Sequence, residues 1–289
     1  MQTKYVLECL STGETLTDDD LPLTNPNAPE PAFLRTKYGV RSFQPRSAEL
    51  GLYRFGDWLP LRRVLHGSSA PVAYRSEALG PTLGLKNLWI SFSGYWPERG
   101  VGMLTGTFKE CEAYSVCGRM PADYPKTLVV ASAGNTARAF ARVCSDNRIP
   151  LALVVPEDNL SALWSVGELD PCVTVIAAAS GADYYDAIHL SGEICGLDGF
   201  VPEGGAKNVA RRDGMATTVL AAAEAMGRIP DWYFQAVGSG TGAIAAWEAT
   251  MRLAGDGGLG TNTMRLALSQ NAPFQLLHDS WARRSRELT

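Results

Sequence analysis

The sequence predicts an α/β fold made of parallel β-α-β units. From about residue 88 onward, short β-branched or apolar runs alternate with helical stretches, and this alternation is typical of parallel sheets with helical crossovers. The chain has 29 glycines and 17 prolines in 289 residues, which favours many short connections. With 46% hydrophobic and 19% charged residues, its composition excludes a disordered or collagen-like protein.

Each element follows from a local pattern. Short apolar runs indicate buried strands, and longer stretches with one apolar face indicate helices. In a first unit, strands are expected at Leu88–Phe92, Thr127–Val130, Leu151–Val155 and Cys172–Ile176, and helices at Phe108–Arg119, Thr136–Asp146 and Tyr184–Cys195. In a second unit, the expected elements are helix Gly214–Met226, strand Trp232–Val237, helix Ala243–Leu253 and strand Met264–Leu268. The consecutive glycines of Pro202–Gly205 make this segment the expected hinge between the units.

The charges and cysteines exclude several classes of function. Lys and Arg number 26 against 30 Asp and Glu, so the chain has no overall positive field to attract nucleic acid. The six cysteines form no Cys-x-x-Cys pair and the three histidines no cluster with them, so no metal site is expected and the cysteines are interpreted as thiols in a reducing cytoplasm. The N-terminus lacks the apolar core of a signal peptide, and no apolar run approaches the ~20 residues of a membrane-spanning helix.

The glycine-rich segment Gly238-Ser-Gly-Thr-Gly242 follows an expected strand and precedes an expected helix. Small residues at a helix N-terminus leave several backbone N–H groups open to a phosphate, so we interpret the segment as a phosphate-binding loop. The alternative is a plain structural turn. A dinucleotide cofactor is disfavoured, because the next strand runs into Ser269-Gln-Asn271 and offers no carboxylate for a ribose.

Two further loops carry candidate chemistry. The turn Leu104–Phe108 delivers Lys109 to the first turn of a helix, where the dipole disfavours a cation and so favours the neutral amine that Schiff-base chemistry needs. The alternative is an ordinary surface lysine. Ser132-Ala-Gly-Asn-Thr136 lies between a strand and a helix, where open N–H groups and the Asn135 amide can bind a carboxylate or a phenolate. The alternative here is a plain N-cap formed by Asn135 or Thr136.

A basic group follows the Gly-Gly segment. Lys207, Arg211 and Arg212 lie within six residues of one another, and arginine offers a planar donor fork for tetrahedral oxyanions. One interpretation is a site for a phosphate ester or sulfite. The other is a solvated helix start with ion pairs to Glu203 or Asp213.

These motifs carry a resemblance to a known family. Thr107–Lys109, Ser132–Asn135 and Gly238–Gly242, in this order, resemble the fold-type II pyridoxal phosphate enzymes, the threonine synthase and cysteine synthase group. Longer stretches are similar to the cysteate synthases within that group. They are Gly51–Trp58, Asn87–Pro97, Val129–Phe140, Pro202–Met215 and Tyr233–Gly242. The resemblance covers nearly the whole chain.

The resemblance implies a tryptophan synthase β-like fold with two three-layer domains around parallel sheets. Residues 1–85 are expected to be an N-terminal segment that packs on the large domain, residues 86–203 the small α/β domain, and residues 204–289 the large cofactor-binding domain. Members of the family continue through further strands and helices after the phosphate loop, so the C-terminal part of the large domain is expected to be truncated here.

Site roles are implied residue by residue. Lys109 would carry pyridoxal 5'-phosphate as a Schiff base and move the α-proton of the substrate, and Asn135 would contact the pyridoxal 3-oxygen. The cofactor phosphate would be held by Gly238, Ser239, Gly240, Thr241 and Gly242. The substrate carboxylate would be received by Ser132, Ala133, Gly134 and Thr136, and the phosphate ester or sulfite by Lys207, Arg211 and Arg212.

The implied reaction is that of a transferase or lyase acting on an amino-acid phosphate ester. O-phospho-L-serine and sulfite would give L-cysteate and phosphate through a bound aminoacrylate, a step of coenzyme M biosynthesis. A cytoplasmic homo-oligomer with no nucleic-acid or membrane partner is expected. The alternatives are threonine synthase or another pyridoxal phosphate-dependent β-replacing or eliminating enzyme, and a catalytically incomplete chain that binds a ligand without turnover.

Overall fold

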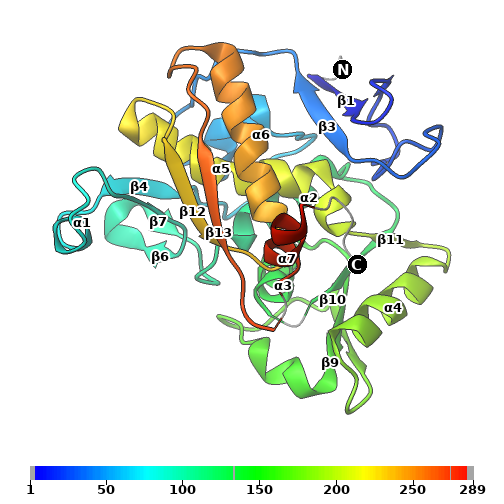
Figure 1. The fold of residues 1–289 in the computed structure, drawn as a ribbon. Coiled ribbons are helices and arrows are strands. Elements are labelled where there is room, and N and C mark those ends of the chain that lie inside the picture. Colours follow the sequence, from blue (N-terminus) through cyan, green and yellow to red (C-terminus); the bar gives the residue numbers. More distant parts are fainter. Residues whose placement is uncertain (1–3, 133, 274, 285–289) are drawn as a thin grey trace.

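A parallel sheet of four strands forms the centre of the first α/β unit (Figure 1). The computed structural model describes residues 4–132, 134–273 and 275–284. The strand order is β10-β9-β8-β11, and the pairs are parallel. The strands are β8 (Thr127–Ala131), β9 (Leu151–Pro156), β10 (Val173–Ala178) and β11 (Phe200–Pro202), and the helices between them are α3 (Asn135–Asn147) and α4 (Tyr184–Cys195). The expected β-α-β pattern is therefore present here.

The central strand β9 shows why this sheet needs helices on both faces. All six of its residues are buried. Leu151, Leu153 and Val155 belong to the main hydrophobic core, whereas Ala152 and Val154 belong to a second cluster that includes residues of α4. Side chains that alternate between two apolar faces require cover on each side, as expected for a parallel sheet. The strand β10 differs from the expectation, because it is an edge strand and leaves Val175 42% exposed.

The second unit contains one parallel pair of strands and two long helices. The elements are α5 (Val209–Met226), β12 (Trp232–Ala236), α6 (Thr241–Asp256) and β13 (Arg265–Ser269). Helix α5 begins five residues before the expected start, because the side chain of Asn208 caps it by accepting from Ala210 N. The glycines before it, Gly204 and Gly205, have positive φ values of 93° and 57°. The hinge role of this segment stays a prediction.

The N-terminal region is more regular than expected. It forms a three-stranded antiparallel sheet in the order β2-β1-β3, with a small apolar cluster of its own that also includes Val209 of α5. Its strands are β1 (Tyr5–Cys9), β2 (Thr15–Leu16) and β3 (Leu34–Tyr38). Strand β3 is tied to the second unit, because Thr36 donates to Asp213 of α5 and Arg35 pairs with Glu248 of α6.

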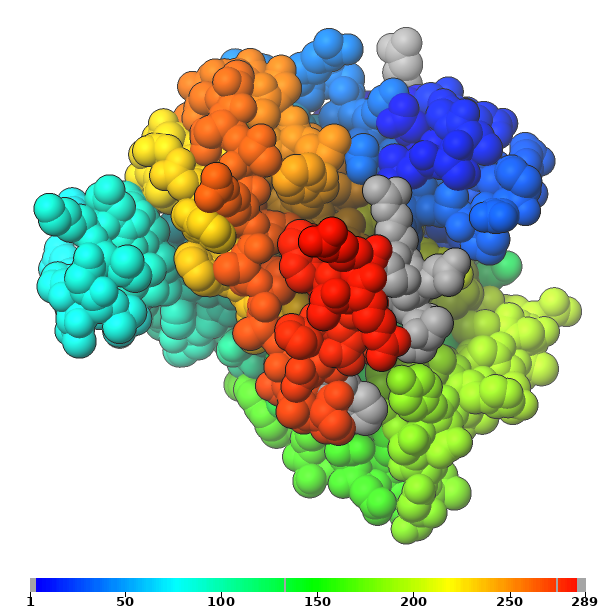
Figure 2. All heavy atoms as spheres, viewed as in Figure 1, coloured from blue at the N-terminus to red at the C-terminus, as the bar shows by residue number. Residues whose placement is uncertain are grey.

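Short elements complete the fold. The expected strand Leu88–Phe92 is present as β5 (Trp89–Phe92). It pairs antiparallel with β4 (Val72–Arg75), so its expected place in a parallel sheet was wrong. The remaining elements are η1 (Ala48–Trp58), β4 (Val72–Arg75), α1 (Leu79–Thr82), β5 (Trp89–Phe92), β6 (Tyr95–Trp96), η2 (Pro97–Arg99), β7 (Val101–Gly102), α2 (Lys109–Arg119), η3 (Glu157–Ala162), η4 (Gly205–Lys207) and α7 (Leu276–Arg283). Helix α7 was not expected, and Figure 2 shows it on the surface, with Trp281 86% exposed.

The main hydrophobic core runs through most of the chain. It includes buried residues from Leu52 in η1 to Met264 next to β13, and it crosses both of the expected boundaries at residues 85 and 203. The division into domains stays a prediction. In the part of the chain that the structure describes, no helix has both the length and the apolar character to span a bilayer.

Candidate active site

Lys109 is the first residue of α2, where the sequence placed it. Its backbone N–H donates to Thr107 Oγ1 at 3.4 Å, and its Nζ lies 4.9 Å from the centre of the Phe108 ring. The loop before it is held by Glu110, whose Oε1 accepts from Thr105 N at 2.5 Å and from Thr105 Oγ1 at 2.7 Å. Burial raises the pKa of Glu110, and these two hydrogen bonds oppose the effect. Lys109 therefore follows a loop that is held by hydrogen bonds, and not a free surface turn.

Lys109 belongs to a largely buried network of four charged side chains. Its Nζ donates to Glu112 Oε2 at 3.2 Å, and Arg211 of α5 grips the same carboxylate with Nη2 at 3.0 Å and Nε at 3.2 Å. Arg211 Nη1 also donates to Glu203 Oε2 at 2.6 Å, and Nη2 to Thr136 Oγ1 at 3.3 Å. Arg211 thus connects the helix of Lys109 with the first turn of α3.

The network balances two cations against two carboxylates, but Glu203 is only partly satisfied. Its Oε2 also accepts from Gly205 N at 3.0 Å, whereas its buried Oε1 has no hydrogen-bond partner among the described residues. Burial raises the pKa of Glu203, while Arg211 opposes the shift and Glu112 adds to it. The charge of Lys109 also lowers the pKa of Glu203, so a change of charge at Lys109 would shift this pKa.

Close packing of α5 on α2 brings the network together. A Cβ at Gly214 would lie 2.2 Å from the carbonyl oxygen of Cys111 and 2.8 Å from Ser115 Cβ, so only glycine fits there. Gly214 lies one turn after Arg211, and Cys111 lies next to Glu112. The contact between the two backbones therefore sets the distance across which Arg211 reaches its carboxylate.

The loop between β8 and α3 is described except for Ala133, so the predicted role of Ala133 lies outside the described residues. Gly134 is the N-cap residue, and its N–H donates to Ser132 Oγ at 3.3 Å. Asn135 is already the first helical residue, so the alternative of an N-cap at Asn135 or Thr136 was wrong. The Asn135 side chain is exposed, and Thr136 is buried beside Arg211.

The glycine loop has the backbone that a phosphate site needs. Gly240 is the N-cap of α6 with a φ of 77°, and a Cβ at Gly242 would lie 2.6 Å from Gln235 Oε1. Ser239 Oγ and Thr241 Oγ1 are 2.8 Å apart, and Gly238 has no atom within 4 Å of its missing Cβ. The first N–H groups of a helix have no acceptor inside it, so this loop fits a phosphate group.

The three cations of the predicted basic group do not form one cluster. Arg212 is 1% exposed, pairs with Glu248 at 3.0 Å and donates to the carbonyl oxygens of Ala206 and Leu34. Arg211 points the other way, into the network at Lys109. Lys207 is exposed and has no ion pair among the described residues. Successive helical residues point in different directions, so closeness in sequence does not gather their charges.

The structure joins some of the predicted residues and leaves others apart. Hydrogen bonds connect Lys109, through Glu112 and Arg211, with Thr136. Within the described residues, no hydrogen bond links this group to the glycine loop, but α5 packs against both α2 and α6 and so lies between them. After β13, Gln270 donates to Gly238 O at 3.3 Å, in the place where a dinucleotide site would have an acidic residue.

Sequence comparison identifies the family. The family model described as "Pyridoxal-phosphate dependent enzyme" matches residues 73–289. The chain belongs to this family. Its cofactor is accordingly pyridoxal 5'-phosphate, and the residues fit it: a lysine is the first residue of α2, and small residues form the N-terminus of α6, where backbone N–H groups can donate to a phosphate.

Two curated relatives are cysteate synthases. The one from Methanocorpusculum labreanum is 47% identical over 277 residues, which cover 96% of this chain and 66% of the relative. The one from Methanosarcina acetivorans is 44% identical over 285 residues, which cover 99% of this chain and 68% of the relative. The resemblance found in the sequence is confirmed, and the chain spans about two thirds of the length of these relatives.

Solved structures confirm the fold-type II class. Maize serine racemase matches with a TM-score of 0.55 and 15% identity, covering 76% of this chain and 61% of that chain. Diaminopropionate ammonia lyase from Escherichia coli matches with a TM-score of 0.57 and 13% identity, covering 85% of this chain and 67% of that chain. At these identities, the likeness concerns the fold alone.

Sequence reasoning missed three acidic residues of the site. Glu110 and Glu112 lie in the first turn of α2, a position that suits carboxylates for reasons of the helix dipole alone. For Glu203, the sequence indicates only an ion-pair partner at a solvated helix start. The spacing of Lys109 and Glu112, three residues apart on one helix, was the available signal.

Proposed function

We propose that the chain uses pyridoxal 5'-phosphate to replace the phosphate group of O-phospho-L-serine by sulfite, giving L-cysteate and phosphate. The observation that carries the proposal is the similarity to cysteate synthases over nearly the whole chain. We include in it a place in the cytoplasm, a role in coenzyme M biosynthesis and association into a homo-oligomer. Six free thiols fit a reducing compartment, and exposed apolar side chains such as Phe234 and Trp232 fit a protein interface.

Lys109 is the catalytic residue of the proposal. The cofactor, when bound, supplies the electron sink that lets bonds at the α- and β-carbons of the amino acid break. Lys109 Nζ holds the cofactor and, once released, takes the α-proton. Glu112 accepts a hydrogen bond from this nitrogen at 3.2 Å, and Arg211 connects the same carboxylate with Thr136 in the first turn of α3. Asn135 would contact the 3-oxygen of the bound cofactor.

Backbone donors bind the anionic groups. The loop Gly238, Ser239, Gly240, Thr241 and Gly242 takes the phosphate of the cofactor, because it precedes the N-terminus of α6. Ser132, Gly134 and Thr136 take the substrate carboxylate at the N-terminus of α3. Of the three cations proposed for the phosphate ester or sulfite, Lys207 remains a candidate, and Arg211 remains one only by exchanging part of its hydrogen bonds to Glu112, Glu203 and Thr136. The donors of Arg212 are already occupied by Glu248 and by two carbonyl oxygens, so Arg212 is no longer a candidate.

Product analysis tests this function. The chain loaded with pyridoxal 5'-phosphate is incubated with O-phospho-L-serine, with and without sulfite, and both phosphate and L-cysteate are measured. Sulfite-dependent L-cysteate in the parent chain and none in Lys109→Ala supports the proposal. Phosphate release without L-cysteate points to an eliminating enzyme. A chain that binds the cofactor at Lys109 but releases no phosphate contradicts catalysis and supports a ligand-binding role.

A further inference from the structure

Arg138 lies one turn after Asn135 on α3, and its guanidinium is held on three sides. Nη2 donates to Asn135 Oδ1, Nη1 donates to Ala162 O at 3.2 Å, and the group lies 4.5 Å from the centre of the Trp164 ring. No carboxylate of the described residues forms an ion pair with it. Its Nε is buried without a hydrogen-bond partner, and burial lowers the pKa of Arg138. This is an arginine whose charge is turned toward an amide.

The chemistry of the pair fixes the orientation of Asn135. A guanidinium carries only donors, so the atom of Asn135 that faces it is the amide oxygen. The NH₂ group of Asn135 then points away from Arg138, on a side chain that is exposed. Hydrogen bonds in a chain polarise one another, so a cation on the oxygen side makes this NH₂ group a stronger donor.

We propose that Arg138 is a positioning residue that locks the Asn135 amide with its NH₂ group toward the cofactor, ready to donate to a negatively charged oxygen. The inference rests on the proposed function, which puts Asn135 against the pyridoxal 3-oxygen. Rotating the amide by half a turn would set its NH₂ group against the guanidinium. Arg138 therefore excludes the orientation in which Asn135 would offer an oxygen to an anion.

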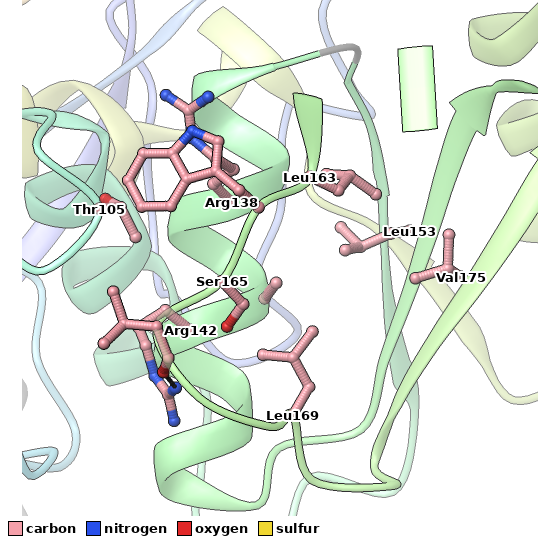
Figure 3. A pocket seen from close by; sticks show the side chains of 11 residues that line it. Thr105, Arg138, Arg142, Leu153, Leu163, Ser165, Leu169 and Val175 are labelled. Carbon is pink, nitrogen blue, oxygen red and sulfur yellow. Dashed lines mark hydrogen bonds between the residues drawn. The ribbon is translucent and has the colours of Figure 1, made fainter. Parts of the chain in front are cut away.

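Arg142 provides a matched comparison. It lies one turn further along α3, and both arginines line a small pocket of about 70 Å³ (Figure 3). Arg142 donates to Val166 O at 2.8 Å, much as Arg138 donates to Ala162 O, so both tie α3 to the segment that follows β9. Arg142 pairs with Asp146 and does not contact Asn135. Replacing either arginine removes a hydrogen bond between α3 and the segment after β9, but only replacing Arg138 also removes the contact with the Asn135 amide.

Cofactor titration separates the two roles. The absorption band of the lysine-bound cofactor is titrated with pyridoxal 5'-phosphate in the parent chain, Arg138→Met, Arg142→Met, Asn135→Ala and the double variant Asn135→Ala/Arg138→Met. We expect Arg138→Met to raise the dissociation constant about tenfold, as for a weakened hydrogen bond to a charged group. Arg142→Met should change it less than about twofold. In the Asn135→Ala background, Arg138→Met should add nothing, because its effect passes through the amide.

Two outcomes of the titration overturn the proposal: equal effects of the two arginine variants, or an undiminished effect of Arg138→Met in the Asn135→Ala background. A second readout needs no cofactor. The side-chain amide signal of Asn135 in the ¹⁵N NMR spectrum, identified by its loss in Asn135→Ala, should shift in Arg138→Met and stay in place in Arg142→Met. If the parent chain binds no cofactor, the proposed function fails, and this signal still decides: a shift supports the positioning role, and an unchanged signal refutes it.

Discussion

Replacing Arg211 by methionine removes the cation that two buried carboxylates share. At an effective dielectric constant of about 20, opposite charges 2.6 and 3.0 Å apart attract by about 6 kcal/mol each, before desolvation is subtracted. Breaking buried pairs typically destabilises by about 3–5 kcal/mol. In the variant, Glu203 can take a proton, and this removes its uncompensated buried charge and limits the loss of stability. From its ordinary pKa of 4.5, protonation at pH 7 requires about 3.4 kcal/mol.

We therefore expect Arg211→Met to lose about 3 kcal/mol of unfolding free energy at pH 7 and about 1 kcal/mol at pH 5. Glu112 keeps Lys109 as a partner in the variant. Urea unfolding of the cofactor-free chain at both pH values measures the loss. The control is Arg228→Met, which removes an exposed pair with Asp231 at 2.6 Å and should change stability by less than about 1 kcal/mol. Equal losses in the two variants, or a loss at pH 7 no larger than at pH 5, would show that Arg211 does not stabilise the two buried carboxylates.

Three further predictions concern the same region. Gly214→Ala should lower the free energy of unfolding by about 3 kcal/mol, the upper end of the usual cost of overpacking, because its Cβ would lie 2.2 Å from Cys111 O. An unchanged thermal midpoint would contradict the close packing. Glu203→Gln should remove a loss of stability with rising pH: burial raises the pKa of Glu203, so its contribution is complete below pH 4.5 and fades as the pH rises through the raised value. The difference between the unfolding curves of parent and variant from pH 4 to 7 measures this, and parallel curves would speak against it. Thr105→Val should loosen the loop before Lys109 through loss of the hydroxyl bond to Glu110, seen as faster hydrogen exchange there; unchanged exchange rates would show that the bond does not brace the loop.

Elements with a strong local signal could be predicted from the sequence. The helix Tyr184–Cys195 has the expected bounds, because Asp183 and Asp186 form a capping box at its start. The strand β9 follows from an apolar run that is buried on both faces. In these places, the residues that decide the structure are neighbours in the sequence.

The start of α5 could not be predicted in the same way. Arg211, Arg212 and Asp213 form a polar run without an apolar face, so the sequence predicts a helix only from Gly214 onward. In the fold these charges are neutralised by residues far along the chain, as in the pair of Arg212 with Glu248. Long-range ion pairs leave no local periodicity, and the same limitation hid the contact between Arg211 and Glu112.

The candidate site divides along the same line. The motifs indicated Lys109 and the two small-residue loops, because backbone donors at a helix N-terminus have a local signature. The groups that orient these residues were not indicated. Glu112 and Arg138 each lie three residues after the group that they contact, but such spacing is common on helices and becomes informative only once burial is known.

The role of Lys109 is tested most simply by finding which lysine of the chain binds the cofactor. The protein is loaded with pyridoxal 5'-phosphate and treated with borohydride, which fixes the lysine–cofactor bond, and peptide mass mapping then finds the modified residue. We expect modification at Lys109, close to one per chain, and its loss in Lys109→Ala. Modification spread over exposed lysines such as Lys126 and Lys207, with Lys109 unmodified, would contradict the assignment of Lys109 and with it the proposed function.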